Sequence, residues 1–170
     1  MKLAVVLHDV RSVHNVGSIF RTADAAGVEA VYLCGITPGP FDRLKDLRPD
    51  FAKVALGAHE YIPWKSAKSA EEAIGELRKS GYRILAVEQS RKAMPYHKIP
   101  VRRDSRLALV LGNEVKGLPP GILALADGIA EIPMFGRKES LNVAVAFGIV
   151  AFGLRFSRVR PWQTLSKRKK

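Results

Sequence analysis

Short apolar runs alternate with segments of helical periodicity along most of this 170-residue chain. The runs are apolar at successive positions, which is typical of strands that are buried on both faces of a parallel sheet. Parallel strands need crossover connections, and the intervening helical segments can supply them. The pattern therefore predicts an α/β fold, with a parallel sheet and helices on both of its faces. We expect strands at 3–7, 28–34, 83–88, 107–111 and 128–132, and a short strand near 61–64.

Residues that typically cap or end helices indicate where the helices lie between these strands. The first helix is expected over about 16–26, followed by a glycine, which commonly stands after a helix end. Ser69 and Glu72 form a capping-box pattern that opens a helix ending near residue 81. Short helices are expected over 51–56 and after Pro119. The final helix, from about residue 142 to 156, is apolar nearly all round, so it must be packed on several sides, and a second copy of the chain would provide one of them.

The cysteine and histidine content limits the classes of site. The single cysteine, Cys34, excludes an internal disulfide framework and a cysteine-based zinc site, and its place after an apolar run predicts a buried thiol. The four histidines lack metal-ligand spacing, so no metal is expected. The N-terminal run is too short for a signal peptide, and the apolar stretch 143–154 falls short of the roughly 20 residues that span a bilayer. We therefore expect a cytoplasmic protein without membrane association.

The formal net charge of +12 points to a polyanionic partner. Neutralising phosphates releases counterions, which supplies affinity for nucleic acid whatever its sequence. Every charged residue from Arg155 to Lys170 is basic, with Phe156 and Trp162 between them. We expect the basic tail, 157–170, to contact nucleic acid. The alternative is a solvated tail without a partner.

Two polar loops follow apolar runs in the last third of the chain. The first is Gly112-Asn113-Glu114, and the second leads from Ile132-Pro133-Met134 to Ser140-Leu141-Asn142. Glycine lets a ligand approach the backbone, and α/β folds bind ligands at the carboxyl ends of parallel strands. The two loops together predict one pocket, with the basic segment 135–139 suited to gripping a phosphate. Taken singly, the first is also explained as an ordinary turn, and Ser140 as a cap of the last helix.

A third polar segment opens the first helix. It contains Asn15 and, six residues later, Arg21, which we expect on neighbouring faces of the helix start. Taken alone, Asn15 is equally explained as a helix cap, and Arg21 as the partner of Asp24 or Glu29 in a surface ion pair. The chain has no G-x-G-x-x-G after its first strand, no Walker A sequence and no H-E-x-x-H, so these familiar sites are excluded.

Taken in order, the three segments resemble the motifs of the SpoU (TrmH) family. Its members are ribose 2′-O-methyltransferases of the SPOUT superfamily, which use S-adenosylmethionine and act on RNA. The resemblance covers about 3–156 and implies a methyltransferase domain over 1–156 with the basic tail behind it. It also implies a C-terminal trefoil knot, although chains are usually unknotted, and a homodimer with the final helix in the interface.

The resemblance also implies the roles of individual residues. The adenine of the cofactor would meet backbone groups around one set of residues, with the others nearby: Gly112, Ile132 and Leu141, then Leu111, Asn113 and Met134. The reaction would depend on four more: Arg21, Glu114, Asn142 and Asn15. Arg21 matches the family's catalytic arginine, Glu114 and Asn142 would shape the site, and Asn15 would orient Arg21 or the ribose.

The chemistry of Arg21 narrows its role. A guanidinium keeps its proton far above neutral pH, so Arg21 is a poor general base. It is better suited to stabilise the developing alkoxide or to clamp the adjacent phosphate. Whether Glu114 acts as the general base stays open.

The substrate class is expected to be tRNA rather than rRNA. Many family members that modify rRNA carry an extra N-terminal RNA-binding domain, whereas here the first strand begins at Leu3. The basic tail and the group Arg43, Lys45 and Arg48 are possible substitutes for such a domain. Alternatives are an rRNA methyltransferase, a non-catalytic RNA-binding module and a small-molecule α/β enzyme.

Overall fold

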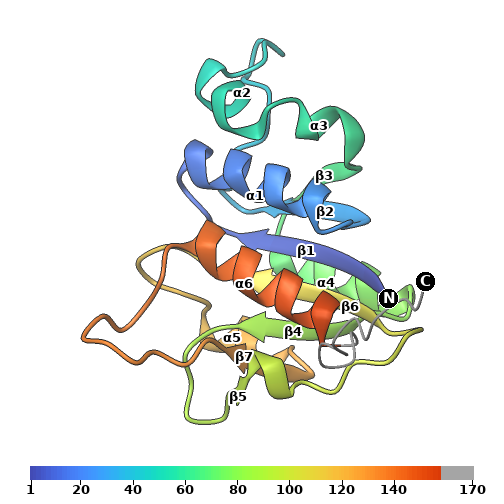
Figure 1. Cartoon of the computed structure of the whole chain (residues 1–170). Helices are drawn as coiled ribbons and strands as arrows, with labels where there is room; N and C mark the ends of the chain where they lie inside the picture. The colour runs from blue at the N-terminus through green and yellow to red at the C-terminus, as the bar shows by residue number, and fades with distance from the viewer. Residues whose placement is uncertain (158–170) are drawn as a thin grey trace, which may run out of the picture.

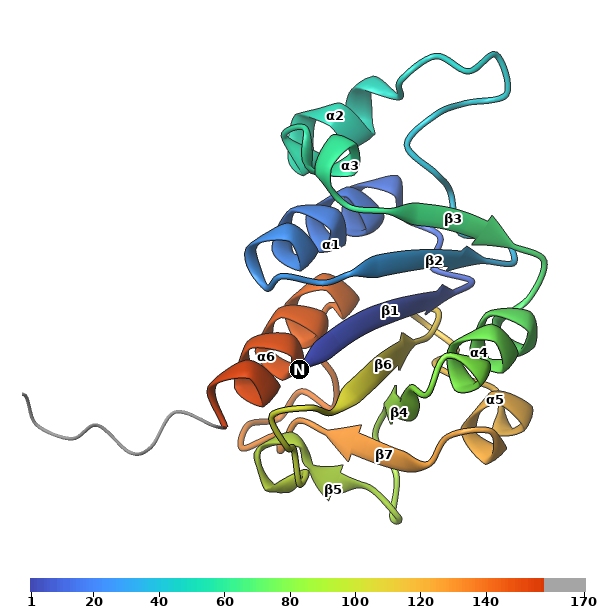
Figure 2. The same ribbon diagram turned by 90° about the vertical axis from the view of Figure 1, so that its right-hand side faces the viewer.

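A computed structural model describes residues 1–157 and shows a seven-stranded sheet in the order β3-β2-β1-β6-β4-β7-β5. Every neighbouring pair of strands is parallel. Figure 2 shows the strands in this order, from β3 at the top to β5 at the bottom. The strands are β1 Lys2–His8, β2 Ala30–Cys34, β3 Trp64–Ala67, β4 Arg83–Val87, β5 Met94–Pro95, β6 Arg106–Leu111 and β7 Gly128–Glu131.

Helices cover both faces of this sheet. Figures 1 and 2 show α1 and α6 on one face, with α2 and α3 beyond α1, and α4 and α5 on the other face. The helices are α1 Val13–Ala25, α2 Pro49–Ala55, α3 Ala58–Tyr61, α4 Ala70–Lys79, α5 Pro120–Ala124 and α6 Val143–Phe156, with a 3-10 turn, η1, at Tyr96–Lys98. The predicted parallel α/β fold with helices on both faces is confirmed.

Strand β1 shows how the sheet is held between two cores. Its alternate residues Leu3, Val5 and Leu7 lie in the cluster under α1, α2 and α6, whereas Ala4 and Val6 lie in the cluster under α4 and α5. All five are fully buried. Successive side chains of a strand point to opposite faces, so an uninterrupted apolar run is what burial on both faces requires. Burying a large apolar side chain contributes about 1.5–3 kcal/mol.

Several element boundaries differ from the sequence-based expectation. Helix α1 begins at Val13 because Ser12 caps it, its side chain accepting a hydrogen bond from the Asn15 backbone N–H at 3.2 Å. Asn15 is therefore not the cap. Strand β3 lies at 64–67 rather than near 61–64, because residues 58–61 form α3. Strand β5 has only two residues and was not predicted, since so short a strand leaves no pattern.

Helix α6 is packed on one side and partly exposed on the other. Phe147, Val150 and Leu154 are fully buried, whereas the side chains of Val145 and Phe156 are 50% and 62% exposed. Arg155 fixes the end of the helix, donating to the carbonyls of Ala26 at 2.8 Å and Met1 at 3.0 Å, and to that of Gly27. The packing predicted for this helix is thus satisfied in part within the chain.

Three expectations concern features other than these elements. The basic tail, apart from Ser157, lies outside the described residues. The trefoil knot stays a prediction. Within residues 1–157, no helix is long and apolar enough to cross a membrane.

Candidate functional site

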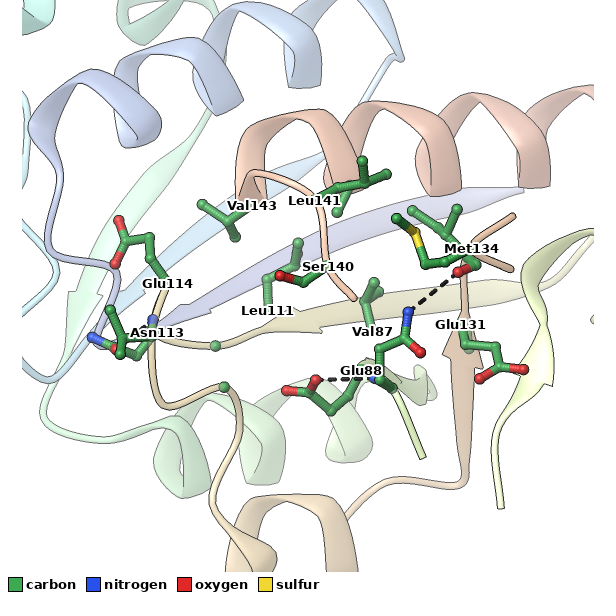
Figure 3. A pocket seen from close by; sticks show the side chains of 17 residues that line it. Val87, Glu88, Leu111, Asn113, Glu114, Glu131, Met134, Ser140, Leu141 and Val143 are labelled. Atoms are coloured by element: carbon green, nitrogen blue, oxygen red, sulfur yellow. Dashed lines mark hydrogen bonds between the residues drawn. The ribbon is translucent and has the colours of Figure 1, made fainter. Parts of the chain in front are cut away.

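A pocket lies where the carboxyl ends of three neighbouring strands, β6, β4 and β7, meet the start of α6. Figure 3 shows its walls coming from the loop after β6, the end of β4, the segment after β7 and the residues that lead into α6. All six residues predicted to bind the cofactor line this one pocket: Leu111, Gly112, Asn113, Ile132, Met134 and Leu141. Glu114 lines it as well.

The lining of the pocket combines apolar side chains with polar ones, and all of its charged side chains are carboxylates. Leu111, Met134, Leu141 and Val143 supply apolar surface (Figure 3), and Glu88, Glu114 and Glu131 are the acidic members. Among the described residues that line it, none is lysine, arginine or histidine. The pocket is therefore an acidic spot in a chain whose formal net charge is +12, and it favours a cationic ligand over a phosphate.

The first wall is a closed loop between β6 and α5. The Gly117 N–H donates to the Asn113 carbonyl at 2.9 Å, and the Asn113 side-chain oxygen accepts from the backbone N–H groups of Val115 and Lys116, each at 3.0 Å. A Cβ on Gly112 would lie 2.5 Å from the Gly117 carbonyl group. Glycine is thus required at position 112 by the closure of the loop itself.

The side-chain amide of Asn113 also fixes this loop to the end of β1. It donates to the Asp9 carbonyl at 2.8 Å. Asp9 has a positive φ of 54°, and its carboxylate accepts from the Ile36 N–H at 3.0 Å. The loop after β6 is therefore tied to the loops that follow β1 and β2.

Glu114 holds the start of α1 against the pocket. Its carboxylate accepts hydrogen bonds from the backbone N–H groups of Arg11 at 3.0 Å and Ser12 at 3.1 Å, and from the Asn15 side-chain amide at 2.9 Å. Burial by itself raises the pKa of Glu114, but the hydrogen bonds, led by that of Arg11, outweigh it and hold the pKa below its ordinary value of 4.5. A carboxylate so arranged is a weak base.

Asn15 and Asn142 continue this contact as a chain of hydrogen bonds. The Asn142 amide donates to the Asn15 side-chain oxygen at 3.0 Å, and the Asn15 amide donates to Glu114. The Asn142 oxygen is itself occupied, because it caps α6 by accepting from the Ala144 N–H at 2.9 Å. Both amides are therefore fixed in orientation, and the three segments identified in the sequence are joined at one point.

Arg21 is the one predicted catalytic residue that stands apart from this network. It does not line the pocket, and it stands six positions after Asn15, a rise of about 9 Å along the axis of α1. It is exposed, and its side chain forms no hydrogen bond or ion pair with residues 1–157. The ion pair with Asp24 or Glu29 is accordingly not formed, and Glu29 instead binds Lys2 at 3.3 Å.

Other lining residues were missed from the sequence. Glu88 and Gln89 follow β4, and Glu131 ends β7. Glu88 supports the neighbouring loop by accepting from the Leu118 N–H at 2.9 Å, and Gln89 donates to the Ile132 carbonyl at 3.3 Å. The rule that singled out the loop at Gly112-Asn113-Glu114, polar residues after an apolar parallel strand, applies equally to position 88. Ser140 lines the pocket and does not cap α6, which Asn142 does.

The fold and the site together define a parallel α/β protein with a ligand pocket built from three convergent loops. Residues 2–152 match the SpoU rRNA Methylase family. The match covers most of the chain, and the protein belongs to that family.

One similar protein is the 23S rRNA (guanosine-2′-O-)-methyltransferase RlmB of Neisseria meningitidis. It is 35% identical over 157 residues, which are 92% of this chain and 59% of that protein. The chain spans about 60% of the length of the first curated relatives it matches.

Two solved structures extend the comparison. The AdoMet-bound rRNA methyltransferase of Sinorhizobium meliloti is 31% identical with a TM-score of 0.82, over 94% of this chain and 57% of that one. A structure described as giving insights into 2-OH methylation of C/U34 on tRNA is 27% identical with a TM-score of 0.77. It is matched over 92% of this chain and 95% of its own.

Proposed function

We propose that this protein transfers a methyl group from S-adenosylmethionine to a ribose 2′-hydroxyl of RNA, with tRNA as the substrate. The observation that carries the proposal is one acidic pocket at the ends of β6, β4 and β7, which two of the sequence segments line and to which Asn15 of the third is joined by hydrogen bonds with Glu114 and Asn142. Membership of the family supports the reaction class. An AdoMet-bound rRNA methyltransferase with the same fold supports the cofactor.

The chemistry of the pocket fits this cofactor. S-adenosylmethionine supplies a methyl group already activated on a sulfonium. Its sulfonium and ammonium charges suit a lining that contains Glu88, Glu114 and Glu131 and no basic side chain among its described residues. Leu111, Ile132 and Leu141 offer apolar surface beside backbone groups, as an adenine requires. These residues, with Gly112, Asn113 and Met134, would hold it.

The network around Glu114 supports a positioning role rather than a base role for that residue. Its oxygens are already engaged by three donors, and its lowered pKa makes it a poor proton acceptor. Asn15 and Asn142 would likewise hold the cofactor-binding loops in place against α1.

Arg21 remains the proposed catalytic residue because it matches the family's arginine and has no partner among the described residues. An exposed guanidinium is free to bind the RNA, either at the developing alkoxide or at the adjacent phosphate. The first role places positive charge where the reaction develops negative charge as the hydroxyl proton leaves, and the second holds a phosphate that is charged throughout. RNA docking would have to bring the target nucleotide between Arg21 and the pocket.

The choice of tRNA is supported by the likeness to the solved structure associated with methylation of C/U34 on tRNA, which is 27% identical with a TM-score of 0.77. The basic group Arg43, Lys45 and Arg48 would contribute phosphate contacts. An rRNA substrate is the second candidate, favoured by the 35% identity to the Neisseria rRNA enzyme.

Substitution of Arg21 tests the catalytic assignment. We expect Arg21→Ala to lower methyl transfer to tRNA by at least about a hundredfold, in line with the loss of one preorganised donor to a developing oxyanion. The affinity for S-adenosylmethionine, measured by calorimetry, should stay unchanged because Arg21 does not line the pocket. Lys53→Ala, which removes an exposed cation from α2, is the matched control. Near-normal turnover of Arg21→Ala would refute the assignment.

The two rival functions give different results in the same assays. A non-catalytic RNA-binding module would bind tRNA but show no heat of binding with S-adenosylmethionine. A small-molecule enzyme would bind the cofactor without a salt-dependent affinity for RNA.

We further propose that the protein is a cytoplasmic homodimer with a C-terminal trefoil knot. The support for the dimer is the partly exposed apolar surface of α6, which includes Val145 and Phe156. The knot follows from the family resemblance alone, and the location is the expectation drawn from the sequence.

A further inference from the structure

The segment that joins β7 to α6, residues 132–142, projects away from the sheet while its ends line the pocket (Figure 1). Met134 lines the cavity near one end, and Ser140 lines it near the other. The residues between them, 135–139, do not line the cavity but lie between two residues that do, and we call them the rim segment. Phe135 in this stretch is 97% exposed, the highest value among the large apolar side chains of the described residues.

Two cations accompany this aromatic ring. Arg137 and Lys138 are exposed, and neither side chain forms a hydrogen bond or ion pair within residues 1–157. A single exposed apolar side chain is ordinary on a protein surface. Here, however, a fully exposed ring and two unpaired cations share five residues beside a pocket. Glu139 is the only acidic residue of that stretch, so the rim segment is net basic.

An exposed aromatic ring beside two unpaired cations is suited to bind single-stranded nucleic acid. Proteins that bind single-stranded nucleic acid stack bases on aromatic rings and hold the backbone phosphates with cations. A base inside a duplex has both faces covered by its neighbours, so bases that stack on a protein ring come from loops, bulges and ends. Every base has a π-face, and such a contact therefore selects an accessible base rather than a particular one.

We propose that Phe135 stacks on a base of the unpaired RNA segment that carries the target ribose, with Arg137 and Lys138 contacting the flanking phosphates. The inference rests on the proposed function, because a 2′-hydroxyl delivered to the pocket brings its nucleotide and the adjoining ones to the rim. It deepens that function by specifying the substrate class: an RNA whose target region is single-stranded, such as a loop. Phe135 is then a substrate-binding residue that does not contact the cofactor.

A fluorescence titration tests the stacking directly. The probe is a single-stranded octaribonucleotide with one central 2-aminopurine, whose emission falls when the base stacks. We expect Phe135→Ala to weaken binding by about 5- to 150-fold, the range found when stacked aromatics are removed. Phe135→Trp should retain the affinity. Phe135→Leu, which keeps apolar bulk but has no π-face, should lose as much as the alanine variant.

Matched variants distinguish stacking on Phe135 from a general effect of losing exposed aromatic surface. Tyr61→Ala removes another exposed aromatic side chain, 72% exposed on α3, and should leave binding unchanged. In methyl transfer to unfractionated tRNA, kcat/KM of Phe135→Ala should fall by a similar factor. Calorimetry should show an unchanged affinity for S-adenosylmethionine in all of these variants.

Three outcomes would overturn the inference. Wild-type affinity in Phe135→Leu would mean that no base stacks on the ring. A change of oligomeric state in Phe135→Ala would assign the ring to contact with a second copy, and a parallel loss of cofactor affinity would assign it to the cofactor pocket. Failure of the proposed function would look different, since the wild-type protein would then neither bind S-adenosylmethionine nor transfer its methyl group.

Discussion

At the scale of single residues, Glu114 shows how a side chain that looks catalytic can serve to position others. Carboxylates near a reacting hydroxyl invite assignment as general bases, yet this one accepts hydrogen bonds from Arg11, Ser12 and Asn15. Those bonds stabilise the charged form, and they connect a loop at residue 114 to a helix that begins about a hundred residues earlier. Measuring how much these hydrogen bonds contribute to the free energy of unfolding therefore tests the positioning role of Glu114.

We expect Glu114→Gln to lower the free energy of unfolding by about 1 kcal/mol at pH 7, below the roughly 1.5–3 kcal/mol of hydrogen bonds to a charge because Glu114 is exposed. The folded-state pKa lies below the ordinary value of 4.5. The stabilisation is therefore fully present above pH 4.5 and is lost as the pH falls through the lower folded-state pKa. Urea unfolding at several pH values measures the difference between variant and wild type.

The control is Glu139→Gln, because Glu139 is exposed and accepts no hydrogen bond within the described residues. It should show no difference from wild type at any of these pH values. A difference in the free energy of unfolding between Glu114→Gln and wild type that grew toward low pH would contradict the positioning role.

At the scale of elements, the loop after β6 depends on glycine for its closure. A Cβ at Gly112 would meet the carbonyl group of Gly117 at 2.5 Å and the Leu118 nitrogen at 2.7 Å, and none of these backbone atoms can turn away. Gly112→Ala should lower the free energy of unfolding by about 1–3 kcal/mol, as overpacking does. It should also weaken S-adenosylmethionine binding at least about tenfold, because Gly112, Asn113 and Glu114 line the pocket.

Thermal unfolding and calorimetry measure the two effects. Gly121→Ala is the matched control, since a Cβ at that helical position would meet nothing within 4 Å. It should be neutral or slightly stabilising. Wild-type cofactor affinity in Gly112→Ala would show that the loop does not hold the cofactor.

The elements also show which parts of the molecule a sequence can reveal. Strands β1 and β6 are predictable because burial on both faces leaves an unbroken apolar run, and the six predicted cofactor residues lie at the end of β6, after β6 or β7, or just before α6. The contact of Asn142 with Asn15 spans 127 positions, and no local pattern reports it. Ser12 rather than Asn15 caps α1, because either side chain satisfies the capping rule and only the packed helix decides between them.

At the scale of the whole molecule, the proposed homodimer is tested at α6. Val145 is half exposed on a helix with no basic residue before its last turn. We expect Val145→Glu to weaken the dimer at least about tenfold, because a carboxylate would be desolvated in the interface. Sedimentation velocity measures the change. Leu56→Glu, at an exposed position beside α2, should leave the dimer intact. A wild-type monomer would contradict the proposed dimer.

The methyl group itself provides the most direct test of the proposed reaction. The purified protein would be incubated with unmodified tRNA and S-adenosylmethionine that carries a trideuterated methyl group, and the RNA digested to nucleosides for mass spectrometry. We predict that the label appears on the ribose, in a 2′-O-methylnucleoside, and is absent with Arg21→Ala. Label on a base, or no transfer to either tRNA or rRNA, would contradict the proposed function.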